Sequence, residues 1–230
     1  MPRSIILNNS NNMKSKLLYP TLFVLISTSL LQAGQEGWKP LWNGKDLSEF
    51  HRFNGTAKYW IEDGAIVGQT REGSPNSFLC TRQLYEDFEL KFEVLVHNAL
   101  NSGVQIRSRL KQDVGDYGRV YGPQIEIEGG PGQSGYIYGE ATGRGWLSEK
   151  PKDKTHAHNI YKNDEWNQYH IIAKGPSIKV YINDQLVEDL ADQGIYKTHP
   201  SGFIGLQVHG IKRGKGPYEV RWRNLKIKEL

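Results

Sequence analysis

Residues 169–182 read YHIIAKGPSIKVYI, and this stretch decides the fold class. Apolar and polar side chains alternate on both sides of Gly175-Pro176, a pair that is typical of a turn. Alternation with a period of two is the pattern of a half-buried β-strand, so the stretch predicts a β-hairpin. The pair Asn183-Asp184 then predicts the next turn.

The same pattern continues in both directions from this hairpin. Short apolar alternations are separated by Gly, Asn, Asp and Pro, and no stretch of helical period exceeds a turn or two. The pattern predicts an all-β fold, a β-sandwich of two antiparallel sheets, in which residues 34–230 form a single domain. The predicted strands are 60–62, 65–69, 77–81, 88–96, 102–109, 124–128, 136–138, 168–174, 177–182, 202–209 and 218–228.

The first 33 residues differ from the rest in composition. Lys14 and Lys16 precede an apolar stretch over residues 17–31, and a small residue ends the segment. This order is that of a signal peptide over residues 1–33, with Met13 as a candidate for the true first residue. The apolar stretch is shorter than the about 20 residues that a spanning helix needs, so we expect no stable membrane span after cleavage. The sequence therefore predicts an exported protein, periplasmic or extracellular.

Charge and motifs exclude several classes of function. Of the formal net charge of +4, three units come from basic residues in 1–33, so residues 34–230 carry +1. A near-neutral chain without a Lys/Arg-rich run lacks the electrostatic footprint of a nucleic-acid-binding protein, and we expect no nucleic acid as partner. The glycines of residues 129–132 do not open a predicted helix, so they do not form a nucleotide-binding loop. No Gly-x-Ser-x-Gly elbow occurs, which removes the simplest serine-hydrolase hypothesis. We therefore predict no cofactor. The single cysteine, Cys80, cannot form an internal disulfide, so a hydrophobic core has to stabilise the domain.

Alternation places the polar side chains of three predicted strands opposite their apolar neighbours. These strands are 102–109, 124–128 and 202–209. If they lie in one sheet, their polar side chains form one surface. Its members are Gln105, Arg107, Gln124, Glu126, Glu128, Gln207 and His209.

The residue types on this surface point to carbohydrate. Alternation alone predicts a solvent-exposed sheet face, which remains the simplest alternative. Amide, carboxylate, guanidinium and imidazole groups, however, offer the donors and acceptors that bind sugar hydroxyls and move protons. Tyr138 and Trp146 add flat apolar platforms on which a sugar ring can pack. We therefore expect a carbohydrate as the partner of this face.

Several segments also match a known family in order and spacing. They read WKPLWNGKDL at 38–47, WIEDG at 60–64, NSGVQIR at 101–107, GPQIEIE at 122–128, EWN at 165–167, GFIGLQVHG at 202–210 and VRWRNLKIK at 220–228. In these segments the chain resembles the 3-keto-disaccharide hydrolase family, long described only as a domain of unknown function. The resemblance implies a concanavalin-like or laminarinase-like fold, an all-β jelly-roll β-sandwich of two antiparallel sheets with a polar concave face, and an activity on glycosides oxidised at C3. The family often has Asp where Glu128 stands here.

The implied chemistry assigns roles to the polar surface. A ketone at C3 acidifies the hydrogen on C2, so a base can remove it and the C1 substituent can leave, after which water adds back. On this hypothesis the catalytic residues are His209, Glu126 and Glu128, with His209 or Glu126 as base and Glu128 as acid. The substrate-binding residues are Arg107, Gln105, Gln124, Asn101, Gln207, Tyr138 and Trp146. Arg107 and Gln124 would bind the enolate or a hydroxyl group.

Three alternatives to these roles stay open. A metal could replace Arg107 beside the enolate, with Glu126, Glu128 and His209 as ligands, although the pattern does not require one, and we predict no metal. A two-carboxylate glycosidase is the second, since residues i and i+2 on one strand face lie about 6.5–7 Å apart, between the spacings of retaining and inverting enzymes. The third is a lectin-like module without catalysis, which would still bind its ligand after Glu126→Gln.

Overall fold

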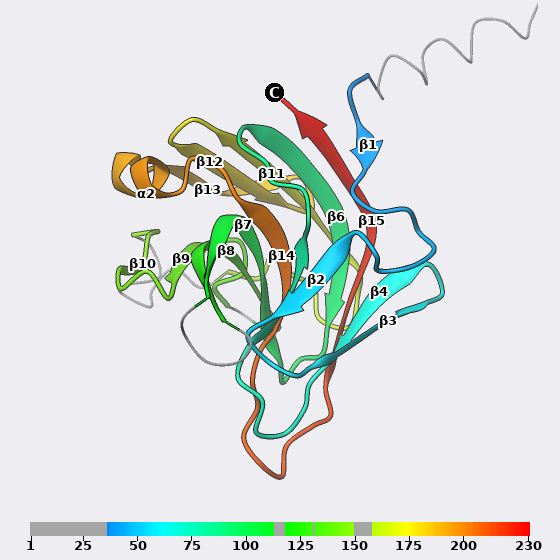
Figure 1. The fold of residues 1–230 in the computed structure, drawn as a ribbon. Coiled ribbons are helices and arrows are strands. Elements are labelled where there is room, and N and C mark those ends of the chain that lie inside the picture. The colour runs from blue at the N-terminus through cyan, green and yellow to red at the C-terminus, as the bar shows by residue number, and fades with distance from the viewer. Residues whose placement is uncertain (1–35, 113–117, 131, 150–157) are drawn as a thin grey trace, which may run out of the picture. The chain divides into compact units, whose positions relative to one another are not determined.

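Regular structure in this computed structural model is almost entirely β-strand (Figure 1). The structure describes residues 36–112, 118–130, 132–149 and 158–230. The predicted signal peptide at 1–33 lies outside these residues. Gly37–Leu230 forms one compact unit, and none of the helices in the described ranges is long and apolar enough to cross a bilayer.

The larger of two sheets has eight strands in the order β13-β12-β11-β6-β15-β4-β3, with β1 paired to β15. All of its pairings are antiparallel. Their bounds are β1 Lys39–Pro40, β3 Lys58–Glu62, β4 Ala65–Gln69, β6 Phe88–Val96, β11 Asn167–Lys174, β12 Ser177–Ile182, β13 Gln185–Ala191 and β15 Glu219–Glu229.

The smaller sheet has seven strands in the order β10-β9-β8-β7-β14-β5-β2, again antiparallel throughout. Helix α2 (Gln193–Thr198) follows β13, and the Asp192 carboxylate caps it by accepting a hydrogen bond from the N–H of Ile195. The strand bounds are β2 Phe50–Phe53, β5 Ser77–Thr81, β7 Asn101–Lys111, β8 Arg119–Glu128, β9 Ile137–Glu140, β10 Gly145–Trp146 and β14 Phe203–Val208.

The core lies between the two sheets. Burial alternates without a break along β6, and its apolar residues face the inner side chains of the smaller sheet in one cluster. The inner side chains of the smaller sheet include Val104, Ile106, Ile125, Ile127 and Leu206, all fully buried. The predicted all-β sandwich of two antiparallel sheets is confirmed. Because the inner face of the smaller sheet belongs to the core, a functional site on this sheet has to lie on its outer face.

The smaller sheet is strongly curved toward its outer face. Asn54 follows β2 at one edge, yet its Oδ1 accepts a hydrogen bond of 3.1 Å from the N–H of Val120 in β8, four strands away. In a flat sheet with about 4.8 Å between strands, these positions would lie about 19 Å apart. Phe78 and Cys80, which point outward, pack with Val120 in a buried cluster. The outer face is therefore concave.

Each of the predicted strands is present: β4, β5, β6 and β12 have the predicted bounds, and the others have shifted ends. Strand β8 begins at Arg119 rather than residue 124, and β9 ends at Glu140 rather than residue 138. The alternation missed β1, β2, β10 and β13. Strands β1 and β10 have two residues each, too few for a period to be visible.

Candidate functional site

A polar cleft of about 290 Å³ lies on the concave outer face of the smaller sheet. Its walls come from β7, β8, β9, β10 and β14, and from residues just before β5 and just after β14. Seven of the ten predicted site residues line it, together with two that the sequence did not suggest. The lining residues are Asn76, Asn101, Gln124, Glu126, Tyr138, Glu140, Trp146, Gln207 and His209.

Glu126 lies at the floor of the cleft and is only 7% exposed. Its Oε1 accepts a hydrogen bond of 2.6 Å from Gln124 Nε2, and its Oε2 accepts one of 3.0 Å from Asn101 Nδ2. Burial raises the pKa of Glu126 to about 7, although these two donors act in the opposite direction. At neutral pH the carboxyl group is therefore able both to take and to give a proton.

A chain of amides orients the Glu126 carboxylate. Gln124 Oε1 accepts from Gln105 Nε2 at 2.7 Å and from Gln207 Nε2 at 2.9 Å. Ser108 Oγ in turn donates to Gln105 Oε1 at 2.6 Å. Because an ionised carboxylate only accepts, each amide in the chain has to turn its NH₂ group toward Glu126. Gln105 thus lies behind Gln124 and does not line the cleft.

Gln207 leaves one acceptor unused. Its Nε2 is bonded to Gln124, but its buried Oε1 has no hydrogen-bond partner among the described residues. A buried oxygen without a partner costs free energy unless a ligand or solvent satisfies it. The unsatisfied oxygen is therefore a local cost of the amide chain that orients Glu126.

Glu140 is a second buried carboxylate in the cleft, 6% exposed, and the sequence reasoning missed it. It lies on the same face of β9 as Tyr138, and its Oε1 is 2.7 Å from Arg119 Nη2. Burial raises its pKa, while Arg119 and His209 act to lower it. The predicted strand stopped at Tyr138 because Gly139 resembles a turn residue; continuing the alternation to residue 140 would have found it.

His209 follows β14 directly and brings an imidazole to the cleft. Its Nδ1 lies 2.7 Å from the Gly210 carbonyl oxygen. Because a carbonyl oxygen only accepts, Nδ1 carries a hydrogen, and Nε2 is the ring nitrogen that can transfer a proton to or from a ligand.

Asn76 is the other lining residue that the sequence did not suggest. Its Oδ1 accepts a hydrogen bond of 2.9 Å from the N–H of Gly210, which fixes the Asn76 amide. The Asn76 Nδ2 has no hydrogen-bond partner in the described ranges. Asn76 lies in a loop, where no alternation could have placed it.

Aromatic side chains form one wall of the cleft. Trp146 pairs with Tyr138 across the β9–β10 ladder. Their ring centroids are 5.4 Å apart at 80°, an edge-to-face arrangement that fixes both rings. An aromatic wall beside a polar floor is suited to a sugar ring, which has apolar C–H faces and a polar rim.

Arg107 was predicted to share this face, and the prediction is wrong. The register of β7 with β8 shifts between Gln105 and Arg109, and Arg107 has a φ of +48°. This β-bulge breaks the alternation and turns Arg107 inward. Its guanidinium, 2% exposed, instead binds the Glu86 and Gly175 carbonyls at 2.5 and 2.6 Å and Asp87 at 2.7 Å.

Glu128 also does not line the cleft. Strand β8 ends at this residue, and its Oε1 accepts a hydrogen bond from the N–H of Gln133, so the carboxylate holds the turn that follows the strand. Glu128 therefore does not converge with Glu126 and His209. Among the described residues, no group of three or more His, Cys, Asp or Glu side chains is arranged to hold a metal ion.

Comparisons with known proteins relate this chain to a carbohydrate-related family and to jelly-roll folds. The model of a family described as "3-keto-alpha-glucoside-1,2-lyase-like domain" matches residues 37–228. A protein of Parabacteroides distasonis ATCC 8503, provisionally named a glycosyl hydrolase, is 21% identical with a TM-score of 0.55, covering 86% of this chain and 96% of that one. A Bacillus subtilis protein of unknown function with a galectin-like fold is 10% identical with a TM-score of 0.58, covering 84% and 94%.

A carbohydrate recognition domain is a further structural neighbour. That of Emp46p is 10% identical with a TM-score of 0.54, and the match covers 80% of this chain and 89% of that one. At these identities the likeness shows the shared jelly-roll fold alone. A search of curated proteins found no match.

Proposed function

Because the chain belongs to the 3-keto-disaccharide hydrolase family, we propose that it is an enzyme that cleaves 3-keto-glycosides by elimination and hydration. The match over residues 37–228 confirms the family resemblance and makes the domain a carbohydrate-related one. The observation that carries the proposal is Glu126, a buried carboxylate with a pKa of about 7 that lines a polar cleft beside His209. A base with a pKa near the working pH is what removal of an acidified C–H requires.

In the first step, ionised Glu126 takes the proton from C2 of the bound sugar. The electron pair of that C–H bond moves toward the C3 carbonyl, whose oxygen becomes an enolate. Asn76 Nδ2 and the Tyr138 hydroxyl line the cleft and are the donors that we assign to this oxygen. Fixed donors of this kind stabilise developing charge without reorganisation. They take the role that the sequence had given to Arg107.

In the second step, the electron pair returns to form the C1–C2 double bond, and the bond from C1 to the leaving oxygen breaks. We assign protonated His209 as the group that gives a proton to this oxygen through Nε2, the role for which Glu128 had been predicted. Water then adds to C1 and gives a proton to His209 Nε2, while C2 regains a proton from Glu126, so both groups return to their starting states. The sum of the steps is hydrolysis, with no oxidant or reductant used.

The size of the cleft limits what it binds. At about 290 Å³ it is at the lower end of ligand pockets, so it takes one sugar ring and leaves the aglycone outside. We therefore expect selectivity for the keto-sugar and tolerance toward the leaving group.

A lectin-like module without catalysis is the second candidate. It is favoured by the fixed amides of the cleft, because they offer hydrogen bonds to sugar hydroxyl groups without any need for catalysis. A two-carboxylate glycosidase is also testable with Glu126 and Glu140.

One experiment separates the three. Residues 34–230 are incubated with matched native and 3-keto glucosides, and the released aglycone is measured. We expect cleavage of the keto form alone, reduced about 10²–10⁴-fold by Glu126→Gln and by His209→Ala. Glu128→Gln, a carboxylate change on the same strand but outside the cleft, is the matched control. Cleavage of the native form would indicate a glycosidase, and binding of sugar without cleavage of either form would indicate a lectin.

A further inference from the structure

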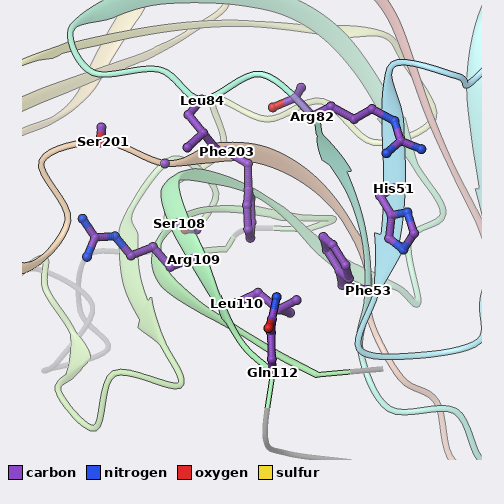
Figure 2. A pocket seen from close by; sticks show the side chains of 12 residues that line it. His51, Phe53, Arg82, Leu84, Ser108, Arg109, Leu110, Gln112, Ser201 and Phe203 are labelled. Atoms are coloured by element: carbon purple, nitrogen blue, oxygen red, sulfur yellow. The ribbon is translucent and has the colours of Figure 1, made fainter. Parts of the chain in front are cut away.

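A second and larger hollow, of about 700 Å³, lies at the other end of the concave face (Figure 2). Strand β14 connects the two places: Gln207, near its C-terminal end, lines the polar cleft, whereas Phe203, at its N-terminal end, lines the hollow. Phe203 and Gln207 are four positions apart, which corresponds to about 13 Å along the strand. The hollow thus lies apart from the proposed catalytic groups.

The surface between the two places is filled. Phe78, Cys80 and Val120 pack with Phe203 in a cluster whose first three members are fully buried. The hydrogen bond between Asn54 and the N–H of Val120 closes the face above this cluster. A ligand in the polar cleft therefore cannot continue into the hollow. A molecule bound in the hollow would be a different ligand.

The centre of the hollow is aromatic and aliphatic. The rings of Phe53 and Phe203 have centroids 6.2 Å apart and are inclined by 34°. Leu84 and Leu110 complete this surface, and Leu84 is 60% exposed although it is apolar. Figure 2 shows Phe203, Phe53 and Leu110 around the same space. A concave apolar surface of this volume fits a small organic molecule with one or two rings.

The rim of the hollow is positive. Among the described residues that line it, none is acidic, while Arg82 and Arg109 stand on opposite sides of the space (Figure 2). Arg82 Nε donates to the Ser48 carbonyl, which anchors that side chain. The Arg109 guanidinium is exposed and has no hydrogen bond or ion pair within the described ranges. A guanidinium without a partner at the edge of an apolar surface is suited to a carboxylate.

We propose that this hollow binds an apolar organic anion, specifically an aromatic carboxylate whose ring packs against the Phe53–Phe203 pair and whose carboxylate pairs with Arg109. Apolar contact supplies the affinity, and the arginine selects the anion over a neutral molecule of the same shape. This site is independent of the proposed function, because neither its residues nor its ligand belong to the polar cleft.

The test compares 2-naphthoate with its neutral analogue 2-naphthalenemethanol by calorimetric titration. We expect saturable binding of both, with naphthoate binding about tenfold more tightly, as one charge-assisted contact implies. Arg109→Gln should remove this difference and leave the neutral probe unchanged. Arg213→Gln, an exposed arginine outside the hollow, is the control and should change neither. Equal binding of the two probes to the unchanged protein, or no saturation at the solubility limit, would overturn the proposal.

A second pair of variants guards against a folding artefact. Leu84 is exposed, so Leu84→Glu and Leu84→Gln should both fold. The glutamate should weaken naphthoate binding about tenfold or more relative to the glutamine, because it places a like charge in the hollow. Equal affinities in the two variants would count against the site. A concentration-dependent dimer that Leu84→Glu dissociates would assign the hollow to a second copy of the chain instead.

Discussion

Glu126 shows how two opposing effects set the chemistry of one side chain. Removal from water disfavours the carboxylate, while the Asn101 and Gln124 amides favour it, and burial prevails because the pKa rises from 4.5 to about 7. Each unit of such a shift corresponds to about 1.4 kcal/mol between the two protonation states. The proton affinity that suits Glu126 for catalysis therefore also makes the fold sensitive to pH.

The first prediction concerns stability. Between about pH 4.5 and 7 folded Glu126 holds a proton that the unfolded chain has lost, so this stabilisation is complete below the lower value and is lost as the pH rises through the upper one. From pH 5 to pH 8 the free energy of unfolding should fall on the order of 2 kcal/mol further in the unchanged protein than in Glu126→Gln. Urea titrations at both pH values measure it. An identical pH dependence in the two proteins would contradict the assignment, and Glu165→Gln, a change of an exposed carboxylate, should behave like the unchanged protein.

The second prediction concerns the rate. If ionised Glu126 is the base, the acid limb of kcat/KM on a 3-keto-glucoside should rise with pH through about 7, the pKa of its carboxyl group. A pH–rate profile of the free enzyme records this limb. A limb near pH 4, where ordinary carboxyls titrate, would assign the base to another group.

At the scale of the strand, alternation predicts faces well until a bulge intervenes. Gln124, Glu126 and Gln207 lie where a period of two places them, because β8 and β14 are regular there. In β7 the register shifts after Gln105, where Arg107 has a positive φ. Such a φ is uncommon for an arginine, so sequence alternation could not predict it. Asn76 could not be predicted for a different reason, since its position depends on a loop contact with Gly210.

The β-bulge in β7 gives Arg107 a structural role that mutation can test. Arg107 binds two carbonyls and Asp87, so Arg107→Met should leave buried acceptors unsatisfied and lower the free energy of unfolding by about 2–4 kcal/mol. Arg109→Met, two residues away and exposed, should cost less than about 0.5 kcal/mol. Urea unfolding of both variants measures the difference. If Arg107→Met is as stable as the control but loses sugar binding, Arg107 belongs to the site after all.

Gly103 links the strand pairing to the catalytic carboxylate. It lies opposite Glu126, and a Cβ there would be 2.7 Å from Gln124 Cδ, so Gly103→Ala has to displace the Gln124 side chain. Glu126 then loses a donor that favours its ionised form. We expect the acid limb of the pH–rate profile to move to higher pH while the melting temperature shows that the domain is still folded. An unchanged limb with reduced activity would mean that the glycine serves packing alone.

At the scale of the whole molecule, one curved sheet carries two chemically different surfaces. A polar cleft with Glu126 and His209 lies at one end, and an apolar hollow with an arginine rim lies at the other. Sequence patterns predicted the sandwich and most of the cleft, because both follow from alternation and from family motifs. The hollow was not predicted, since its residues come from separate strand ends that only the curvature brings together.

We further propose that the protein is exported, on the basis of the basic start and the apolar stretch in residues 1–33. When the full chain is expressed in a bacterium, the protein recovered outside the cytoplasm should begin at Gly34. N-terminal sequencing measures this. Recovery of an uncleaved chain in the cytoplasm would contradict the proposal.

The most direct test of the account is the fate of the C2 hydrogen. Cleavage of a 3-keto-glucoside is carried out in D₂O, and the released sugar is analysed by mass spectrometry and NMR at times short enough that an enzyme-free control shows no exchange. Elimination followed by hydration predicts deuterium at C2, because the proton on Glu126 exchanges with solvent when water replaces the aglycone. A product that retains its original C2 hydrogen, together with equal cleavage rates for substrates that carry hydrogen and deuterium at C2, would show that the bond breaks by direct substitution at C1 and that Glu126 does not act as the base assigned here.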